Sequence, residues 1–185
     1  MPLSKDLAMS ADELDDFMKS CANMRIATFS PSGRINLTPL WFGWAGGKVY
    51  TMCRGQKVRN LRRNQVATVI VDRNELVYEL QGAMLQGTAI VLEDADAEDA
   101  DPDLEEARLQ MGQKYSSSSD SNEVPRNSGT ASGRTRRWVV FTPEQIVTWD
   151  NTKNPSLKGE HLRHSCRCYF INFVSEPNVG TTTTS

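Results

Sequence analysis

The sequence lacks the features that would assign it to a membrane, secretory or nucleic-acid-binding class. No apolar run approaches the roughly 20 residues that a membrane-spanning helix needs, and the N-terminal segment contains no apolar signal region. Only four cysteines are present in 185 residues, which, without a secretory signal, is typical of reduced thiols. The formal net charge of −2 gives no overall reason to expect a nucleic-acid partner. We therefore expect a cytoplasmic protein that binds neither membranes nor nucleic acid.

Histidine is also scarce. The two histidines are His161 and His164, so residues 1–160 contain none. We find no pair of carboxylates whose spacing indicates general acid–base catalysis. The catalytic residues therefore stay unknown at the level of sequence.

Polar tracts lower the hydrophobic content to 38%, a small share for a compact domain. Residues 93–106 contain nine acidic and no basic side chains, and we interpret them as a solvated loop entering a charged helix at about 103–115. Residues 116–136 are polar and of low complexity, which predicts a flexible insertion. The expected organisation is one domain over 1–153, containing this insertion, followed by a disordered tail over 154–185.

The rest of the chain is dominated by runs rich in β-branched and aromatic residues, separated by short turns. Ser10 and Glu13 have the spacing of a capping box, which predicts an amphipathic helix over 10–22. Short connections without long crossover helices are typical of an antiparallel barrel. Gly82 and Gly87, inside one strand-like run, predict a bulge or a close approach of backbone or ligand. The expected strands cover 24–30, 35–44, 48–53, 66–72, 80–94 and 137–150, the last as one or two strands.

A basic segment follows the third expected strand. In YTMCRGQKVRNLRRNQ, residues 50–65, five positive side chains fall within ten positions, and no acid follows before Asp72. A solvated helix face, a nucleic-acid patch and a phosphate pocket could each explain this charge. Since no aromatic residue lies between Tyr50 and Tyr78, the nucleic-acid explanation is the weakest.

The start of the helix expected in this segment has the features of a phosphate cradle. A helix N-terminus presents unpaired N–H groups, Gly55 permits close backbone approach, and Arg54 and Lys57 add full charges. The GxxxxGK[ST] spacing of nucleotide hydrolases is absent. Taken alone, the segment fits this cradle and a solvated amphipathic helix equally well. Arg62 and Arg63 belong to the solvated face in either interpretation.

The strand NLTPLWFGW, residues 36–44, precedes the basic segment. Alternation along the strand sends Thr38 and Leu40 to one face and Pro39 and Trp41 to the other. Proline within a strand predicts an edge or a bulge. The backbone groups beside Pro39 would then be free to bond a ligand.

These segments in their order resemble the pyridoxamine 5′-phosphate oxidase-like split-barrel family. More narrowly, they are similar to its flavin/deazaflavin oxidoreductases, which use FMN or coenzyme F-420. The resemblance covers roughly residues 10–93 and 137–153. It is carried by the RIAT strand, the Gly33 turn, TPLWF, the strand GKVY, KVRNLRRN, the later QG…QGTA strand and the closing segment RWVVFTPEQIVTWD.

The resemblance implies a mostly β protein, a six-stranded antiparallel split barrel with a few short helices. It implies a homodimer with the cofactor in a groove at the interface. The implied cofactor-binding residues are Thr38, Pro39, Leu40 and Trp41 along the ring, Thr51 and Met52 near the ribityl chain, Arg54, Gly55, Lys57 and Val58 at the phosphate, and Gln81 and Gln86 from the partner side.

The implied function is an oxidoreductase that transfers a hydride between the flavin-type cofactor and a small conjugated substrate. The longer, more anionic tail of F-420 could use more of the arginines, which favours the deazaflavin over FMN. The alternative is a non-catalytic barrel that binds flavin or haem.

The C-terminal segment supports a third hypothesis, a metal-binding or redox-sensing tail. HLRHSCRC contains the zinc-ligand types His161, His164, Cys166 and Cys168. The Cys-x-Cys spacing differs from the usual Cys-x₂₋₄-Cys, so we expect no metal site. The polar insertion and the tail beyond Lys153 also depart from the family pattern. The resemblance therefore does not predict how a substrate reaches the groove.

Overall fold

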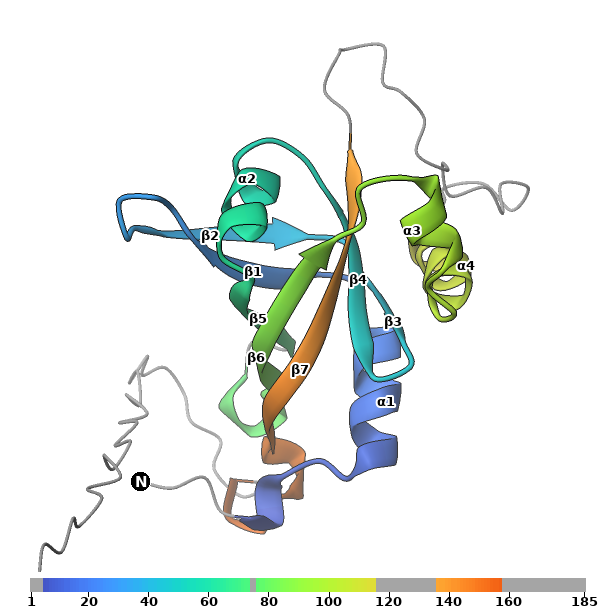
Figure 1. Cartoon of the computed structure of the whole chain (residues 1–185). Helices are drawn as coiled ribbons and strands as arrows, with labels where there is room; N and C mark the ends of the chain where they lie inside the picture. Colours follow the sequence, from blue (N-terminus) through green and yellow to red (C-terminus); the bar gives the residue numbers. More distant parts are fainter. Residues whose placement is uncertain (1–4, 74–75, 116–135, 158–185) are drawn as a thin grey trace, which may run out of the picture.

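A computed structural model describes residues 5–73, 76–115 and 136–157. Its centre is one antiparallel sheet with the strand order β2-β1-β5-β6-β7-β4-β3 (Figure 1). The mostly β antiparallel architecture is therefore confirmed, with seven strands in place of the six expected. The strands are β1 (Met24–Phe29), β2 (Ile35–Leu40), β3 (Gly43–Ala45), β4 (Lys48–Cys53), β5 (Val66–Arg73), β6 (Gln81–Val91) and β7 (Arg137–Asp150).

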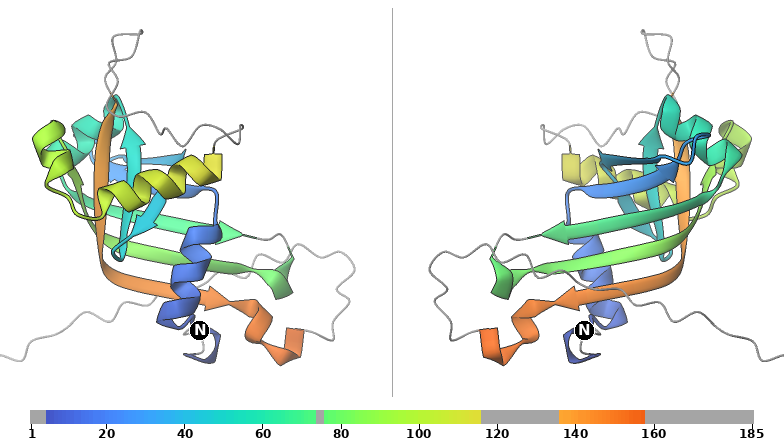
Figure 2. Two further views of the ribbon diagram at one scale, coloured as in Figure 1. Left: turned by 90° about the vertical axis from the view of Figure 1, so that its right-hand side faces the viewer. Right: turned by 90° about the vertical axis from the view of Figure 1, so that its left-hand side faces the viewer.

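The extra strand arises because the run expected over 35–44 divides at Trp41 and Phe42. Its first part, β2, is one edge of the sheet, as Pro39 predicts, and its second part, β3, is the opposite edge. In a flat sheet, six spacings of about 4.8 Å would separate these edges by about 29 Å. The two linking residues can bridge only about 11 Å. The sheet must therefore curl into a half-barrel, and the side views in Figure 2 show this curvature.

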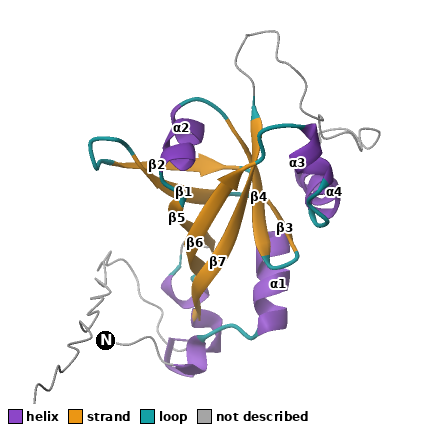
Figure 3. Ribbon diagram, in the orientation of Figure 1, coloured by secondary structure: helices purple, strands orange, loops and turns teal. Residues whose placement is uncertain are grey.

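In the part of the chain that the structure describes, four α-helices pack around the sheet (Figure 3). The capping box of the first helix is present, since Ser10 N donates to Glu13 Oε2 at 2.6 Å and Glu13 N donates to Ser10 Oγ at 3.3 Å. The helix of the basic segment and the charged helix form as expected, whereas the short α3 was not expected. The helices are α1 (Ala11–Ser20), α2 (Gln56–Arg63), α3 (Ala95–Asp99) and α4 (Leu104–Tyr115), with 3₁₀ turns at Lys5–Leu7, Val77–Glu79, Asn151–Lys153 and Pro155–Leu157.

Both faces of β4 are covered, by two different apolar clusters. Val49 and Cys53 point into the concave core of the half-barrel. Tyr50 points the opposite way, into a cluster with Trp138 of β7 and Leu104 of α4. Strand alternation thus places α4 on the outside of the β4–β7 corner of the sheet.

The two glycines of β6 have the expected roles. The ladder between β6 and β7 shifts register between Gln86 and Gly87, which is a bulge. A Cβ at Gly87 would lie 2.1 Å from the Thr142 carbonyl oxygen, and one at Gly82 would lie 2.1 Å from Cζ2 of Trp149. The absence of side chains here permits close strand and ring packing.

Gly87→Ala is therefore expected to lower the free energy of unfolding by about 3 kcal/mol, because the new methyl group meets a backbone oxygen that cannot rotate away. Urea denaturation measures the change. Gly82→Ala is the matched control, with a smaller loss because its obstacle is a side-chain ring that can move. An equal loss for the two variants would contradict this account.

Candidate functional site

The turn into α2, where the sequence predicts a phosphate cradle, lies at one end of the half-barrel (Figure 1). β4 ends at Cys53, and Gly55 turns the chain into α2 with φ 68° and ψ −133°, a conformation that residues with a Cβ avoid. Gly55 is the N-cap and provides no side-chain hydrogen bond to the helix. Apart from Gly55, its two chain neighbours and the backbone of α2, no atom of the described residues lies within 4 Å of where a Cβ at Gly55 would stand. The first N–H groups of α2 therefore have no capping side chain, and Gly55 and Gln56 beside them are exposed.

The positive side chains of this segment divide into two groups. Arg62 makes a two-point contact with Glu93, at 2.7 and 2.5 Å, and Arg63 donates to the Phe29 carbonyl. Within the described part of the chain, Arg54 and Lys57 form no ion pair. The two cations at the helix N-terminus thus have no ion-pair partner within the described residues, whereas the two at its C-terminus contact Glu93 and Phe29.

Buried contacts fix the inner side of α2. Val58 is 6% exposed and belongs to the core, so only its backbone N–H can face a ligand. Asn60 is fully buried and donates to Thr28 Oγ1 at 3.1 Å, while Gln56 donates to Asn60 Oδ1 at 2.9 Å. The sequence analysis missed Asn60; the signal was a polar side chain on the apolar face of the helix, four residues after Gln56.

Cys53, beside the cradle, is not a nucleophile. Its side chain is 1% exposed, and burial raises the pKa of its thiol to about 12, despite the opposing effect of Lys57. A thiol with this pKa remains protonated at neutral pH. Cys53 therefore provides no thiolate for covalent chemistry beside the turn into α2.

The residues expected along the ring lie on β2 and just after it. Thr38 and Leu40 are half-buried, Pro39 is exposed on the sheet edge, and Trp41 is 57% exposed. Thr51 is buried and donates through Oγ1 to the Trp41 carbonyl at 2.7 Å.

Met52, expected near the ribityl chain, is half-buried against the cluster beneath α4. Thr51 thus holds the backbone at Trp41 and Met52 packs beneath α4, while the exposed surface in this region lies on β2 and at Trp41.

Gln81 and Gln86 do not converge with the cradle within one chain. β6 begins at Gln81, at the end of the sheet far from α2 (Figure 1). Being five residues apart on one strand, the two side chains point to opposite faces. Gln86 is exposed on the convex face, opposite Thr68.

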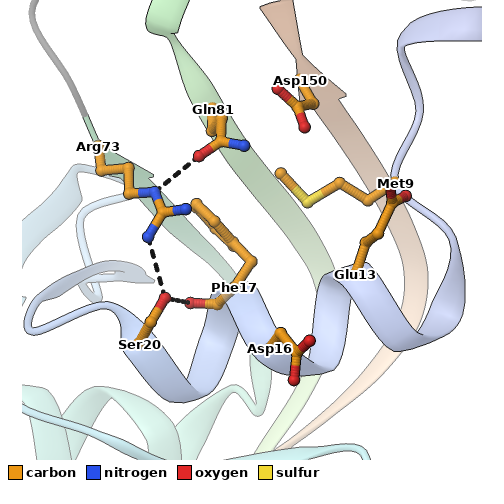
Figure 4. Close-up of a pocket in the computed structure, with 8 residues that line it drawn as sticks. All are labelled: Met9, Glu13, Asp16, Phe17, Ser20, Arg73, Gln81 and Asp150. Atoms are coloured by element: carbon orange, nitrogen blue, oxygen red, sulfur yellow. Dashed lines mark hydrogen bonds between the residues drawn. The ribbon is translucent and has the colours of Figure 1, made fainter. Parts of the chain in front are cut away.

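Gln81 lines a hollow of about 320 Å³ between α1 and the ends of β5 to β7 (Figure 4). Arg73 closes one side of this hollow by donating to Gln81 Oε1 at 2.7 Å and to Ser20 Oγ at 3.0 Å. Three acidic residues and two apolar ones complete the wall, and the sequence analysis did not find this hollow. They are Glu13, Asp16 and Asp150, with Met9 and Phe17.

The convex face of β1, β2, β5 and β6 exposes a group of apolar side chains. Ile35 and Leu37 are 64% and 62% exposed on β2. Ile35 faces Phe29 across the β1–β2 ladder, and Val66 and Ile90 are 53% and 50% exposed.

Two classes of feature are absent from the described ranges. No helix there is long and apolar enough to cross a membrane. No group of three or more histidine, cysteine or acidic side chains in residues 5–73, 76–115 and 136–157 could hold a metal ion. The segment HLRHSCRC lies outside these residues.

The family model described as pyridoxamine 5′-phosphate oxidase matches residues 10–150. No curated protein sequence matches the chain.

Solved structures share the fold at low sequence identity. A conserved hypothetical protein from Mycobacterium tuberculosis has a TM-score of 0.66 and 21% identity, over 89% of this chain and 98% of that one. An FAD-binding protein from Mesorhizobium loti has a TM-score of 0.55 and 18% identity, over 76% and 93%. An F-420 reductase has a TM-score of 0.50 and 17% identity, over 72% and 94%.

Proposed function

Because the chain belongs to the pyridoxamine 5′-phosphate oxidase family, we propose that it is an oxidoreductase using a flavin-type cofactor, FMN or F-420. Its substrate is a small conjugated molecule. The observation that carries the proposal is the uncapped N-terminus of α2, where Arg54 and Lys57 are unpaired within the described chain. Solved relatives in the fold that are described as FAD-binding and as an F-420 reductase support the same class of cofactor.

The cradle fits a phosphate group in three respects. A phosphate at a helix N-terminus is stabilised by free N–H groups and by the helix dipole. Gly55 leaves room for its close approach. Arg54 provides a planar fork for two oxygens, and Lys57 provides a compact charge.

When bound, the flavin-type ring provides the hydride chemistry. This chain's residues bind and orient the cofactor. The Arg54–Lys57 turn holds the phosphate, and the β2 edge beside Pro39 and Trp41 presents backbone and an aromatic surface to the ring. Within the described residues we assign no side chain to proton transfer.

The spare charge favours F-420 over FMN. Arg59, on the exposed side of α2, also forms no ion pair within the described residues. Three available cations exceed what one phosphate monoester needs, and a longer anionic tail could use them. Arg62 and Arg63 do not contribute, because Glu93 and Phe29 engage them.

We place a second copy of the chain on the convex apolar face. Such a dimer would cover Ile35 and Leu37, and it would bring the partner's copy of that face toward the cofactor groove. Gln86, on the same convex face, is then positioned to contact the cofactor across the interface.

The test is a titration of the purified protein with FMN and with F-420, followed by a transfer assay. Tight binding of one cofactor, and anaerobic oxidation of its reduced form by a small quinone such as menadione, are the expected results. Binding without transfer to any acceptor in a panel would favour the non-catalytic alternative, and a Soret band would indicate haem. Failure to bind either cofactor contradicts the proposal.

A further inference from the structure

The last residue of α4, Tyr115, lies against the two-residue link between the sheet edges. Its ring stacks on that of Trp41, with centroids 4.5 Å apart and an interplanar angle of 5°. Near-parallel stacking at this distance stabilises an aromatic pair beyond the effect of the area that it buries. One side of the Trp41 ring is therefore covered by Tyr115.

The hydroxyl of Tyr115 holds the same link through its backbone. It accepts a hydrogen bond from Phe42 N at 3.1 Å and donates to the Ala22 carbonyl. On the other side of the link, Thr51 Oγ1 donates to the Trp41 carbonyl at 2.7 Å. The peptide group that joins Trp41 to Phe42 is thus held from β4 and from α4 together.

α4 is itself fixed where it approaches this link. Gln110 accepts from Trp44 N at 3.0 Å and donates to the Trp44 carbonyl at 2.7 Å. Lys114 Nζ donates to the Met18 and Cys21 carbonyls at 3.2 and 3.1 Å, at the C-terminal end of α1. Tyr115 follows Lys114 directly, so its ring belongs to a rigid corner.

Trp41 is nevertheless 57% exposed. An exposed tryptophan normally moves between rotamers, and ordering it would cost a ligand part of its binding free energy. Here stacking and backbone contacts have already ordered it. A held aromatic ring with an uncovered side is a preorganised binding surface.

We propose that Trp41 and Tyr115 form a stacked platform on which the uncovered side of Trp41 binds a planar tricyclic heteroaromatic ring of the flavin type. Tyr115 acts through Trp41 and is a positioning residue. The identity of the ring rests on the proposed function. The platform itself rests on the contacts of α4, an element for which the sequence analysis predicted no role in the site.

The test separates ring binding from phosphate binding. Lumiflavin has the ring without a phosphate, and inorganic pyrophosphate has the charge without a ring. Trp41→Leu and Tyr115→Leu are expected to weaken lumiflavin binding by about 2- to 12-fold, the value of one aromatic pair, and to leave pyrophosphate binding unchanged. Lys57→Ala is expected to show the reverse pattern. A structural role alone would weaken both ligands together.

Two further variants strengthen the assignment. Tyr115→Trp keeps a stacking ring and should restore lumiflavin affinity relative to Tyr115→Leu. Leu109→Ala, at a 47% exposed position of the same helix, should bind lumiflavin as the wild type does. Near-UV circular dichroism of the unliganded protein should change in Tyr115→Leu and not in Leu109→Ala, because only the former uncouples the two rings.

The outcomes distinguish this proposal from the proposed function. If Trp41→Leu and the wild type bind lumiflavin equally while Lys57→Ala loses FMN, the platform is wrong and the cofactor assignment stands. If lumiflavin binding depends on Trp41 but no hydride transfer is found, the platform stands and the enzyme proposal fails. If Trp41→Leu shifts the protein to monomer with lumiflavin affinity unchanged, a second copy covers the ring and the platform is overturned.

Discussion

The double variant Arg54→Ala with Lys57→Ala is expected to bind FMN and F-420 at least about 100-fold more weakly than the wild type. Each charged hydrogen bond to a phosphate is worth about 1.5–3 kcal/mol, and both cations are removed. The thermal midpoint should change little, since neither side chain forms an ion pair within the described chain. Titration of the intrinsic fluorescence with each cofactor measures the loss.

The matched control removes the same charge from the other end of α2. Arg62→Ala with Arg63→Ala should leave cofactor affinity within a few-fold of the wild type and should lower stability, because contacts to Glu93 and Phe29 are lost. Wild-type binding should also weaken as salt is raised. Equal loss of cofactor affinity in the two double variants would show that only overall charge matters, and the cradle assignment would fail.

The division of this basic segment illustrates what the sequence could predict. Position in the segment separated Arg54, Gly55 and Lys57, at the helix N-terminus, from Arg62 and Arg63, which contact Glu93 and Phe29. The phosphate-binding role of the first three stays a prediction. The fold followed for a similar reason, since strand runs, turn glycines and the Ser10 capping box are local signals. The extra strand β3 was not predicted. The break at Trp41 that separates it from β2 depends on the curvature of the assembled sheet, which the local sequence does not indicate.

The features that the sequence did not reveal depend on contacts between distant segments. Tyr115 reaches Phe42 across 73 positions, and Arg73 joins α1 to β6. Nothing in the local pattern of either residue indicates its partner. Such contacts are fixed by packing, which periodicity does not report.

The acidic tract gives a related lesson. Residues 93–106 were interpreted as a solvated loop entering a charged helix, yet two of the acids fasten the α3–α4 connection to β4 and a third joins α3 to α4. Asp101 accepts from Tyr50 Oη at 2.9 Å, Asp103 accepts from Lys48 Nζ at 3.0 Å, and Glu98 pairs with Arg108 at 2.5 Å. Acidic side chains thus help to hold the helix that ends at Tyr115.

The second large effect is expected at the convex face. Ile35→Asp with Leu37→Asp should convert a dimer to monomers at micromolar concentration, with the dissociation constant raised at least about 100-fold. A two-fold interface presents the same patch twice, so the double variant places four carboxylates where apolar side chains would be buried. Analytical ultracentrifugation measures the change. Cofactor affinity should fall with dimerisation, since the partner would complete the groove.

Leu109→Asp is the control, because Leu109 is 47% exposed but lies on α4, away from the convex face of β1 and β2. It should leave the dissociation constant unchanged. The double variant should remain folded by circular dichroism, because Ile35 and Leu37 are mostly exposed in the single chain. A wild-type protein that is monomeric, or a double variant that dimerises and binds cofactor normally, would contradict the interface. Loss of the dimer with full cofactor affinity would instead confine the groove to one chain and remove Gln86 from it.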